Sequence, residues 1–163
     1  MHRFIALAWN AADAERSAIA ADLASRVRTD NAGWSCALDG DGLRIFHTGG
    51  HGIASDVHVL KGGTGAVIGK LFRRGLERET PHTIEFESSE SDLILGSRGR
   101  HLMAHYWGRY VGFLYDADQG THLVFRDPAA ALPCFALRYR GIDIFFGAGL
   151  DSGERLSGSD GYE

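Results

Sequence analysis

The chain has 163 residues, 44% of them hydrophobic and 23% charged, which is the composition of an ordinary soluble globular domain. The length suits one domain better than two, because domains most often contain roughly 100–150 residues. With 17 Lys and Arg against 21 Asp and Glu, the formal charge is −4, so the sequence lacks the basic surface that non-specific nucleic-acid or anionic-membrane binding requires. We therefore expect neither a nucleic acid nor a membrane as a partner.

The sequence predicts a cytoplasmic protein. No apolar run approaches the ~20 residues that span a bilayer, and the start of the chain lacks the length and cleavage site of a signal peptide. The two cysteines, Cys36 and Cys134, each lie in an apolar, strand-like stretch. In a reducing compartment both are expected to remain buried thiols, so neither a disulfide framework nor a clustered zinc site is predicted.

The N-terminal half predicts a strand, a helix and further strands. Asn10 is a suitable N-cap for the helix, whose apolar residues fall near one face. The Asp-Gly-Asp-Gly segment at 39–42 predicts a hairpin turn, because glycine supplies the positive φ that tight turns need. The predicted elements are, in order, a strand over 3–9, a helix over 11–28, and strands over 34–38, 43–47, 56–60 and 66–72.

The C-terminal half predicts two helices and a run of strands. Glycine 108 is expected to end the second helix. The tail 151–163 has almost no apolar residues and is expected to be disordered, because it cannot bury enough surface to offset its ordering entropy. The predicted elements are an edge strand over 82–86, a helix from 88 through 95, a helix over 100–107, and a four-stranded meander over 109–115, 121–126, 133–139 and 142–146.

Four segments of the C-terminal half form a recognisable series. They are Tyr106-Trp-Gly-Arg-Tyr-Val-Gly-Phe-Leu-Tyr-Asp116, Leu123-Val-Phe-Arg-Asp-Pro128, Leu132-Pro-Cys-Phe135 and Phe145-Phe-Gly-Ala-Gly-Leu150. The series resembles the glutamine amidotransferase domain of asparagine synthetases, in which G-x-F-A-F-x-x-x-D precedes R-D-x-x-G-x-x-P-L-Y and a strand ending near F-A-S-E-L closes the domain. The resemblance spans most of the chain and is sharp from about residue 106 onward.

The resemblance implies the fold. The expected class is α+β, a four-layer αββα sandwich of two antiparallel sheets as in N-terminal-nucleophile hydrolases and class II glutamine amidotransferases, over residues 1–150. Arg126, Asp127 and Pro133 match the family's motif and are expected to be structural, since an arginine and an aspartate at a strand end can hold a turn by charge-assisted hydrogen bonds. Arg73 is expected near the place of the arginine with which the family binds substrate glutamine.

The start of the chain departs from the family. There, a cysteine exposed by removal of the initiator methionine is the nucleophile and its own α-amino group is the base, so thiol and terminus belong to one residue. This sequence has His2 in that position, and Cys36 or Cys134 would acquire a free amine only by cleavage of the chain. It also has no Asn-Gly dipeptide of the kind with which the family reads glutamine. No catalytic residue is therefore assigned, and the domain is expected to be glutaminase-inactive.

The opening Arg3-Phe-Ile-Ala-Leu-Ala-Trp9 is similar to that of the asparagine-synthetase-like cyclases of lasso-peptide clusters. Such enzymes adenylate a side-chain carboxylate of a precursor peptide with ATP and magnesium, and the precursor's own amine closes a macrolactam, so no ammonia is needed. The resemblance implies that ATP and magnesium bind in a C-terminal synthetase domain that is absent from this sequence. The expected partners are that domain or a partner protein, with the precursor peptide as a further candidate. The Ser/Gly segment at 156–161 lacks the flanking strand and helix of a pyrophosphate loop.

Two other hypotheses stay open: a glutamine-hydrolysing asparagine synthetase domain whose start is misassigned or processed, and a non-catalytic scaffold that binds a peptide or protein.

A metal site is not predicted. His101 and His105 lie four residues apart without the glutamate of an H-E-x-x-H motif. The histidines at 47, 51 and 58 lie on separate predicted elements and have no paired ligand motif.

Overall fold

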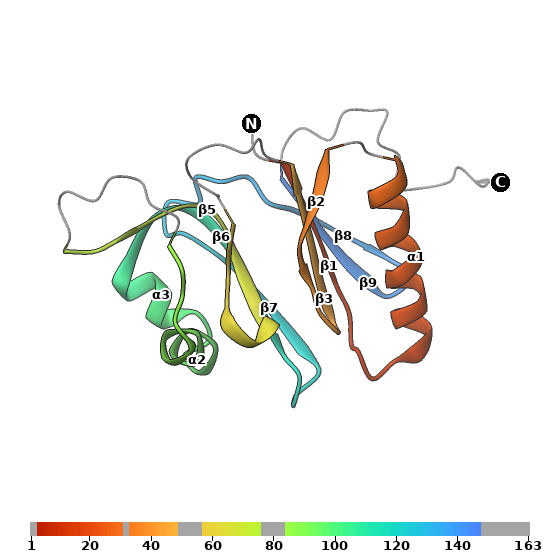
Figure 1. Ribbon diagram of the computed structural model, residues 1–163, viewed down its shortest axis with the longest axis horizontal. Coiled ribbons are helices and arrows are strands. Elements are labelled where there is room, and N and C mark those ends of the chain that lie inside the picture. Colours follow the sequence, from red (N-terminus) through yellow and green to blue (C-terminus); the bar gives the residue numbers. More distant parts are fainter. Residues whose placement is uncertain (1–2, 31–32, 49–56, 76–83, 148–163) are drawn as a thin grey trace.

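The computed structural model describes residues 3–30, 33–48, 57–75 and 84–147 (Figure 1). Most of the predicted strands and helices are confirmed, and the chain is a mixed α+β protein. None of the helices in the described ranges is long and apolar enough to cross a membrane. The elements are β1 (Arg3–Ala8), α1 (Ala14–Asp30), β2 (Trp34–Asp39), β3 (Leu43–Thr48), β4 (Val57–Val59), a 3-10 turn η1 (Lys61–Gly63), β5 (Gly65–Arg73), α2 (Ser88–Gly96), α3 (Arg100–His105), β6 (Tyr106–Asp116), β7 (Thr121–Arg126), β8 (Phe135–Tyr139) and β9 (Ile142–Phe146).

The strands form two sheets in which every described pairing is antiparallel. The first, called sheet A, has the order β2-β3-β1-β9-β8, and the second, sheet B, has the order β4-β5-β6-β7. Strand β1 is therefore central in sheet A, and the chain reaches sheet B only after the β2–β3 hairpin. The coarse expectation of two antiparallel sheets is confirmed.

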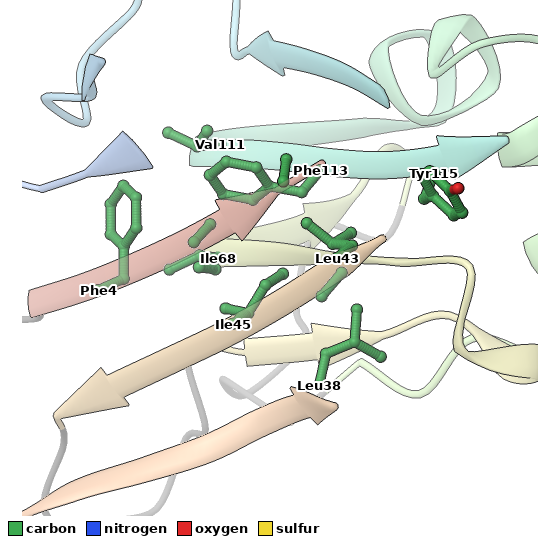
Figure 2. Packing of buried hydrophobic residues seen from close by; sticks show 11 residues of the cluster. Phe4, Leu38, Leu43, Ile45, Ile68, Val111, Phe113 and Tyr115 are labelled. Atoms are coloured by element: carbon green, nitrogen blue, oxygen red, sulfur yellow. The ribbon is translucent and has the colours of Figure 1, made fainter. Parts of the chain in front are cut away.

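Hydrophobic side chains fill three layers. Along β1, Phe4, Ala6 and Ala8 belong to a cluster shared with Ile68, Val111 and Phe113 of sheet B, so this cluster lies between the sheets (Figure 2). The alternate residues Ile5 and Leu7 pack with α1, because successive side chains of a strand point to opposite faces. A third cluster lies between sheet B and helices α2 and α3. This layering is compatible with a sandwich that has helices on its two outer faces (Figure 1).

The four strands of the C-terminal half do not form one meander. Strands β6 and β7 belong to sheet B, whereas β8 and β9 belong to sheet A. The segment 127–134 carries the chain from one sheet to the other. The prediction was wrong because alternation along each strand reveals two faces but does not reveal which sheet a strand joins.

The N-cap of α1 is Asp13 rather than Asn10. The carboxylate oxygen Oδ1 of Asp13 accepts the backbone N–H of Arg16 at 3.0 Å, three positions further on. Asn10 instead caps a preceding turn, where its Oδ1 accepts the N–H of Ala12 at 3.0 Å. The helix therefore begins at Ala14, later than predicted.

Three further expectations are corrected. In the predicted edge strand 82–86, the described residues 84–86 form no strand, and Phe86 is instead buried in the cluster beneath α2 and α3. The helix predicted over 100–107 ends at His105, and Tyr106 begins β6. Cys36 is exposed rather than buried, because it lies on the edge strand β2 beside a bulge. The tail 151–163 lies outside the described residues.

Candidate functional site

The resemblance directs attention to the end of the sheets at which β1 begins. His2, the residue expected at the family's nucleophile position, lies outside the described residues. The described chain brings the end of β5, the start of β6 and the end of β7 to one end of sheet B, because these strands are antiparallel neighbours. Arg73 and Arg126 close two of these strands, so both predicted site residues lie at this end of the sheet.

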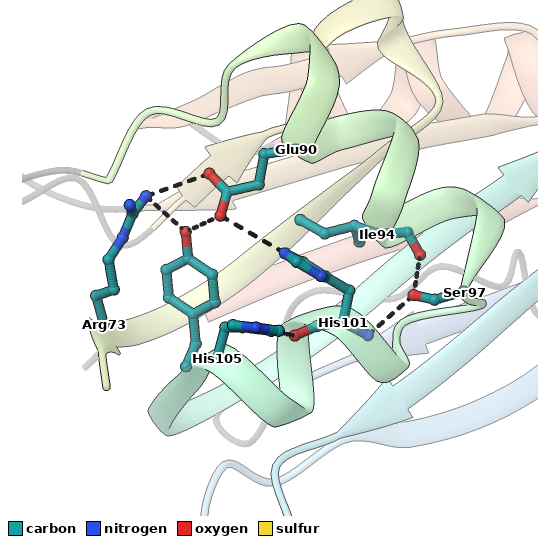
Figure 3. Close-up of polar contacts among 7 residues, drawn as sticks. Arg73, Glu90, Ile94, Ser97, His101 and His105 are labelled. Carbon is teal, nitrogen blue, oxygen red and sulfur yellow. Dashed lines mark hydrogen bonds and ion pairs between the residues drawn. The ribbon is translucent and has the colours of Figure 1, made fainter. Parts of the chain in front are cut away.

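Arg73 does not point into the space between the sheets. It pairs in register with Tyr106, and directly opposed residues share a face of a sheet. Tyr106 belongs to the cluster beneath α2 and α3, so Arg73 lies on the helix-covered side. Its Nη2 donates to the Tyr106 hydroxyl at 2.9 Å and lies 3.2 Å from Oε2 of Glu90 in α2 (Figure 3). The guanidinium also lies 5.4 Å from the centre of the Tyr106 ring.

Tyr106 and Glu90 form a partly buried hydrogen-bonded pair at this position. The tyrosine hydroxyl donates to Oε1 of Glu90 at 2.5 Å, and the side chain of Tyr106 is buried. Burial, reinforced by the hydrogen bond to Glu90, raises the pKa of Tyr106 well above its ordinary value, although Arg73 opposes the shift. The phenol therefore stays protonated at neutral pH and acts as a donor. Arg73 and Tyr106 at the end of sheet B thus both contact Glu90 of α2, which links this helix to the sheet.

The histidines of α3 lie beside this pair. His101 places Nε2 3.9 Å from Oε1 of Glu90, and its ring stacks on His105 with centres 4.1 Å apart (Figure 3). His105 directs Nδ1 at the backbone carbonyl of His101. His58 is buried, and its two ring nitrogens face the carbonyl oxygens of Ile84 and Gly69 at 2.9 and 3.2 Å. Among residues 3–30, 33–48, 57–75 and 84–147, no three His, Cys, Asp or Glu side chains converge as metal ligands. His51 lies outside these ranges.

Arg126 and Asp127 hold the segment that crosses between the sheets. Nη2 of Arg126 donates to the carbonyl oxygens of Ala130 and Leu132 at 2.6 and 2.7 Å. Asp127 is 3% exposed. Its carboxylate accepts three backbone N–H groups, those of Tyr110, Ala129 and Ala131, at 3.3, 3.0 and 3.2 Å. The turn is thus built around these two side chains.

Pro133 and Cys134 follow this turn and precede β8. Pro133 is exposed, whereas Cys134 is half-buried against the cluster between the sheets. Burial raises the pKa of the Cys134 thiol, with Arg126 acting in the opposite direction. Because the thiolate is the nucleophilic form, a raised pKa disfavours reactivity at this cysteine.

A polar contact between the sheets was not predicted. His122 of β7 places Nε2 3.1 Å from Oδ2 of Asp143 in β9. Arg138 of β8 binds the same carboxylate through Nε at 2.6 Å and Nη2 at 3.0 Å. The three residues thus link both sheets beside Phe145. The available sequence signal was Asp143 itself, a lone acid within the apolar strand Ile142–Phe146.

The Asp143 contact predicts a specific loss of stability in acid. Arg138, and more weakly His122, lowers the pKa of Asp143 below its ordinary value, although burial opposes them. A depressed native pKa means that the carboxylate adds stability above the unfolded pKa of about 3.9 and loses it as the pH falls through the native value. In urea titrations, Asp143→Asn should therefore be less stable than the parent chain at pH 7, and the difference should shrink below about pH 4. A difference independent of pH from 7 down to 2.5 would contradict this account.

A pocket of about 660 Å³ lies at the opposite end of the sheets. Its walls combine the segment after β1, the β2–β3 turn, η1 and the β6–β7 turn, and include the carboxylates Asp39, Asp41 and Asp118. Asp39 is already engaged by Arg28 and Arg44 at 2.9 and 2.6 Å. The sequence did not predict that these segments converge, because their convergence depends on the packing of the two sheets.

The pocket and the predicted site residues do not meet. Tyr115 lines the pocket, and its hydroxyl accepts the N–H of Ala11 at 3.2 Å. Tyr115 lies near the end of β6, whereas Tyr106 begins β6 and lies opposite Arg73, the last residue of β5.

No family model, curated protein or solved structure matches the chain in comparisons with known proteins.

Proposed function

We propose that this chain is an amidotransferase-like domain without glutaminase activity, which supports an ATP-dependent, amide-forming domain of the asparagine-synthetase type, as in lasso-peptide cyclases. The proposed architecture is the αββα fold of N-terminal-nucleophile hydrolases. The observation that carries the proposal is the position of β1, central in one of two antiparallel sheets. In such a fold the residue before this strand supplies the nucleophile, and in this sequence that residue is His2 rather than cysteine.

The environments of the other candidate groups support the absence of glutaminase chemistry. Cys36 is exposed on the edge strand β2, and its Sγ contacts the carbonyl oxygen of Leu38 at 3.4 Å. Cys134 is half-buried with a raised thiol pKa. Neither residue can combine its thiol with a free α-amino group while the chain is intact. Arg73 is turned toward Glu90 and Tyr106 on the helix side of sheet B, away from the face between the sheets.

The residues of the C-terminal series support a structural role for this domain. Gly108 to Asp116 form most of β6, the longest of the described strands, which pairs with β5 and β7. Arg126 and Asp127 order the crossing to sheet A. A chain that retains these contacts can keep its fold after losing the nucleophile. In the proposed enzyme, ATP and magnesium bind the synthetase domain, and the present chain supplies that domain with a folded support.

The first test is a glutaminase assay on the purified chain. Glutamate release from glutamine should not exceed that of buffer, and iodoacetamide should not alter it, because no thiol is paired with a terminal amine. The Cys134→Ser variant is the matched control and should behave identically. Thiol-sensitive turnover, together with an intact mass that shows a terminal cysteine, would instead support a processed glutamine-dependent synthetase.

The second test concerns the partner domain. The chain should be co-expressed with the coding sequence that follows it in the genome, and the purified material assayed for release of AMP and pyrophosphate from ATP. Peptide-dependent pyrophosphate release that requires this chain would support the proposal. Stable association with a partner that lacks any adenylating activity would contradict it and favour a binding scaffold.

A further inference from the structure

Strand β8 is an exposed edge of sheet A. All five of its residues are exposed, and β9 is its sole neighbour among the described strands. Phe135, Leu137 and Tyr139 have 52%, 42% and 39% of their surface accessible. They oppose Phe146, Ile144 and Ile142 of β9, residues that pack toward α1, so the three side chains form an apolar row on the α1 face of the sheet.

The other sheet edges carry features that disfavour pairing with another chain, such as bulges, short length or polar side chains. Strand β2 has a register shift between Cys36 and Leu38, and β4 is three residues long. Strand β7 is less accessible to another chain, because Thr121 is its only exposed residue and the other five are partly buried. Strand β8 has an unbroken register and no proline, and its one charged residue, Arg138, is bound to Asp143.

We infer that β8 pairs with β8 of a second copy of this chain, antiparallel and about a two-fold axis at Leu137, which joins the two copies of sheet A into one continuous sheet. In this register Phe135 faces Tyr139 of the second copy, Leu137 faces itself, and Ala136 faces Arg138. The Phe135–Tyr139 pair, which the two-fold axis repeats, and the leucine pair lie on the α1 face, and such cross-strand apolar pairs stabilise a sheet. A two-fold interface requires that one surface complement itself, as this row of side chains does.

Neighbouring registers are less favourable. An axis at Arg138 would place the two guanidinium groups directly opposite each other, and like charges in that position destabilise a sheet. An axis at Ala136 would bring Tyr139 opposite Pro133, which has no N–H to donate. Only the axis at Leu137 pairs all five residues without a charge clash. The inference does not depend on the proposed function.

The interface predicts a weak, concentration-dependent dimer, because one strand pair buries less than the ~1,200 Å² typical of stable complexes. Sedimentation equilibrium of the full chain should show the molar mass doubling as the concentration rises from about 1 μM to about 1 mM, the range expected of such contacts. Leu137→Arg and Leu137→Glu should each remain monomeric, because residue 137 faces its own copy. An equimolar mixture of the two variants should recover the dimer, since opposite charges then meet at the axis.

The control is Leu93→Glu on α2, a leucine that is 55% exposed and distant from β8 in the fold. It should dimerise like the parent chain. Far-UV circular dichroism establishes that each variant is folded. A parent chain that stays monomeric up to 1 mM, a dimer that survives Leu137→Arg, or a mixture that fails to associate would each overturn the inference.

Discussion

Replacing Asp127 by alanine is expected to lower the free energy of unfolding by about 3–5 kcal/mol, the range of a broken buried polar network. Asp127 is 3% exposed, and its carboxylate accepts three backbone N–H groups. Alanine would leave these donors without a partner in a place that water reaches poorly, and the costs would not add in full because the donors share one acceptor group. Urea denaturation followed by far-UV circular dichroism measures the loss.

Asp116→Ala is the matched control for this substitution. Asp116 also accepts two backbone N–H groups with its carboxylate, those of Asp118 and Gln119 at 3.1 Å each, but in an exposed turn. Because water can replace the lost acceptor there, we expect a cost of about 1 kcal/mol or less. Equal losses for the two variants would show that the burial of Asp127 is not what makes its contacts important.

Replacing Gly108 by alanine is expected to cost at least about 3 kcal/mol, because it combines backbone strain with a collision. Gly108 adopts a φ of +144° within β6. An added Cβ would collide with the carbonyl oxygen of Lys70 in the neighbouring strand β5, and backbone atoms cannot move aside as a flexible side chain can. The strands would have to separate where Gly108 lies opposite Leu71, two residue pairs from the contact between Arg73 and Tyr106. Thermal unfolding and soluble yield report the effect.

Gly33→Ala separates strain from collision. Gly33 also has a positive φ, +98°, but an added Cβ would meet nothing within 4 Å. We expect it to cost about 1–2 kcal/mol, the strain of a left-handed non-glycine residue alone. If Gly108→Ala proved no more costly than Gly33→Ala, the close approach of β5 and β6 could not be what requires glycine at position 108.

Local patterns predicted the individual elements well. The predicted Asp-Gly-Asp-Gly turn connects β2 and β3, and Gly42 adopts the positive φ that the prediction assigned to glycine in this turn. The strand boundaries on either side lie within one residue of those predicted. These features depend on neighbours in the sequence, so a single sequence contains the information. The boundary between α3 and β6 was misplaced because Tyr106 and Trp107 continue the apolar spacing of the helix while pairing with β5.

The candidate site could be predicted only in part. Arg126 and Asp127 were predicted to hold a turn, and both contact backbone groups of residues 129–132. The sequence does not reveal the path of that segment, so it could not identify these partners. Arg73 was expected to bind substrate, yet the register with Tyr106 turns it toward α2. A shift of one residue in that register would have placed it on the opposite face.

The sequence by itself determined most of the element types, the acidic charge balance and the histidine that follows Met1, since each is local or compositional. Tertiary structure alone decided which sheet each C-terminal strand joins, which face Arg73 occupies, and that β8 remains an exposed apolar edge. The physical reason is the two-residue period of a strand: it defines two faces, and only pairing with distant strands decides what each face contacts.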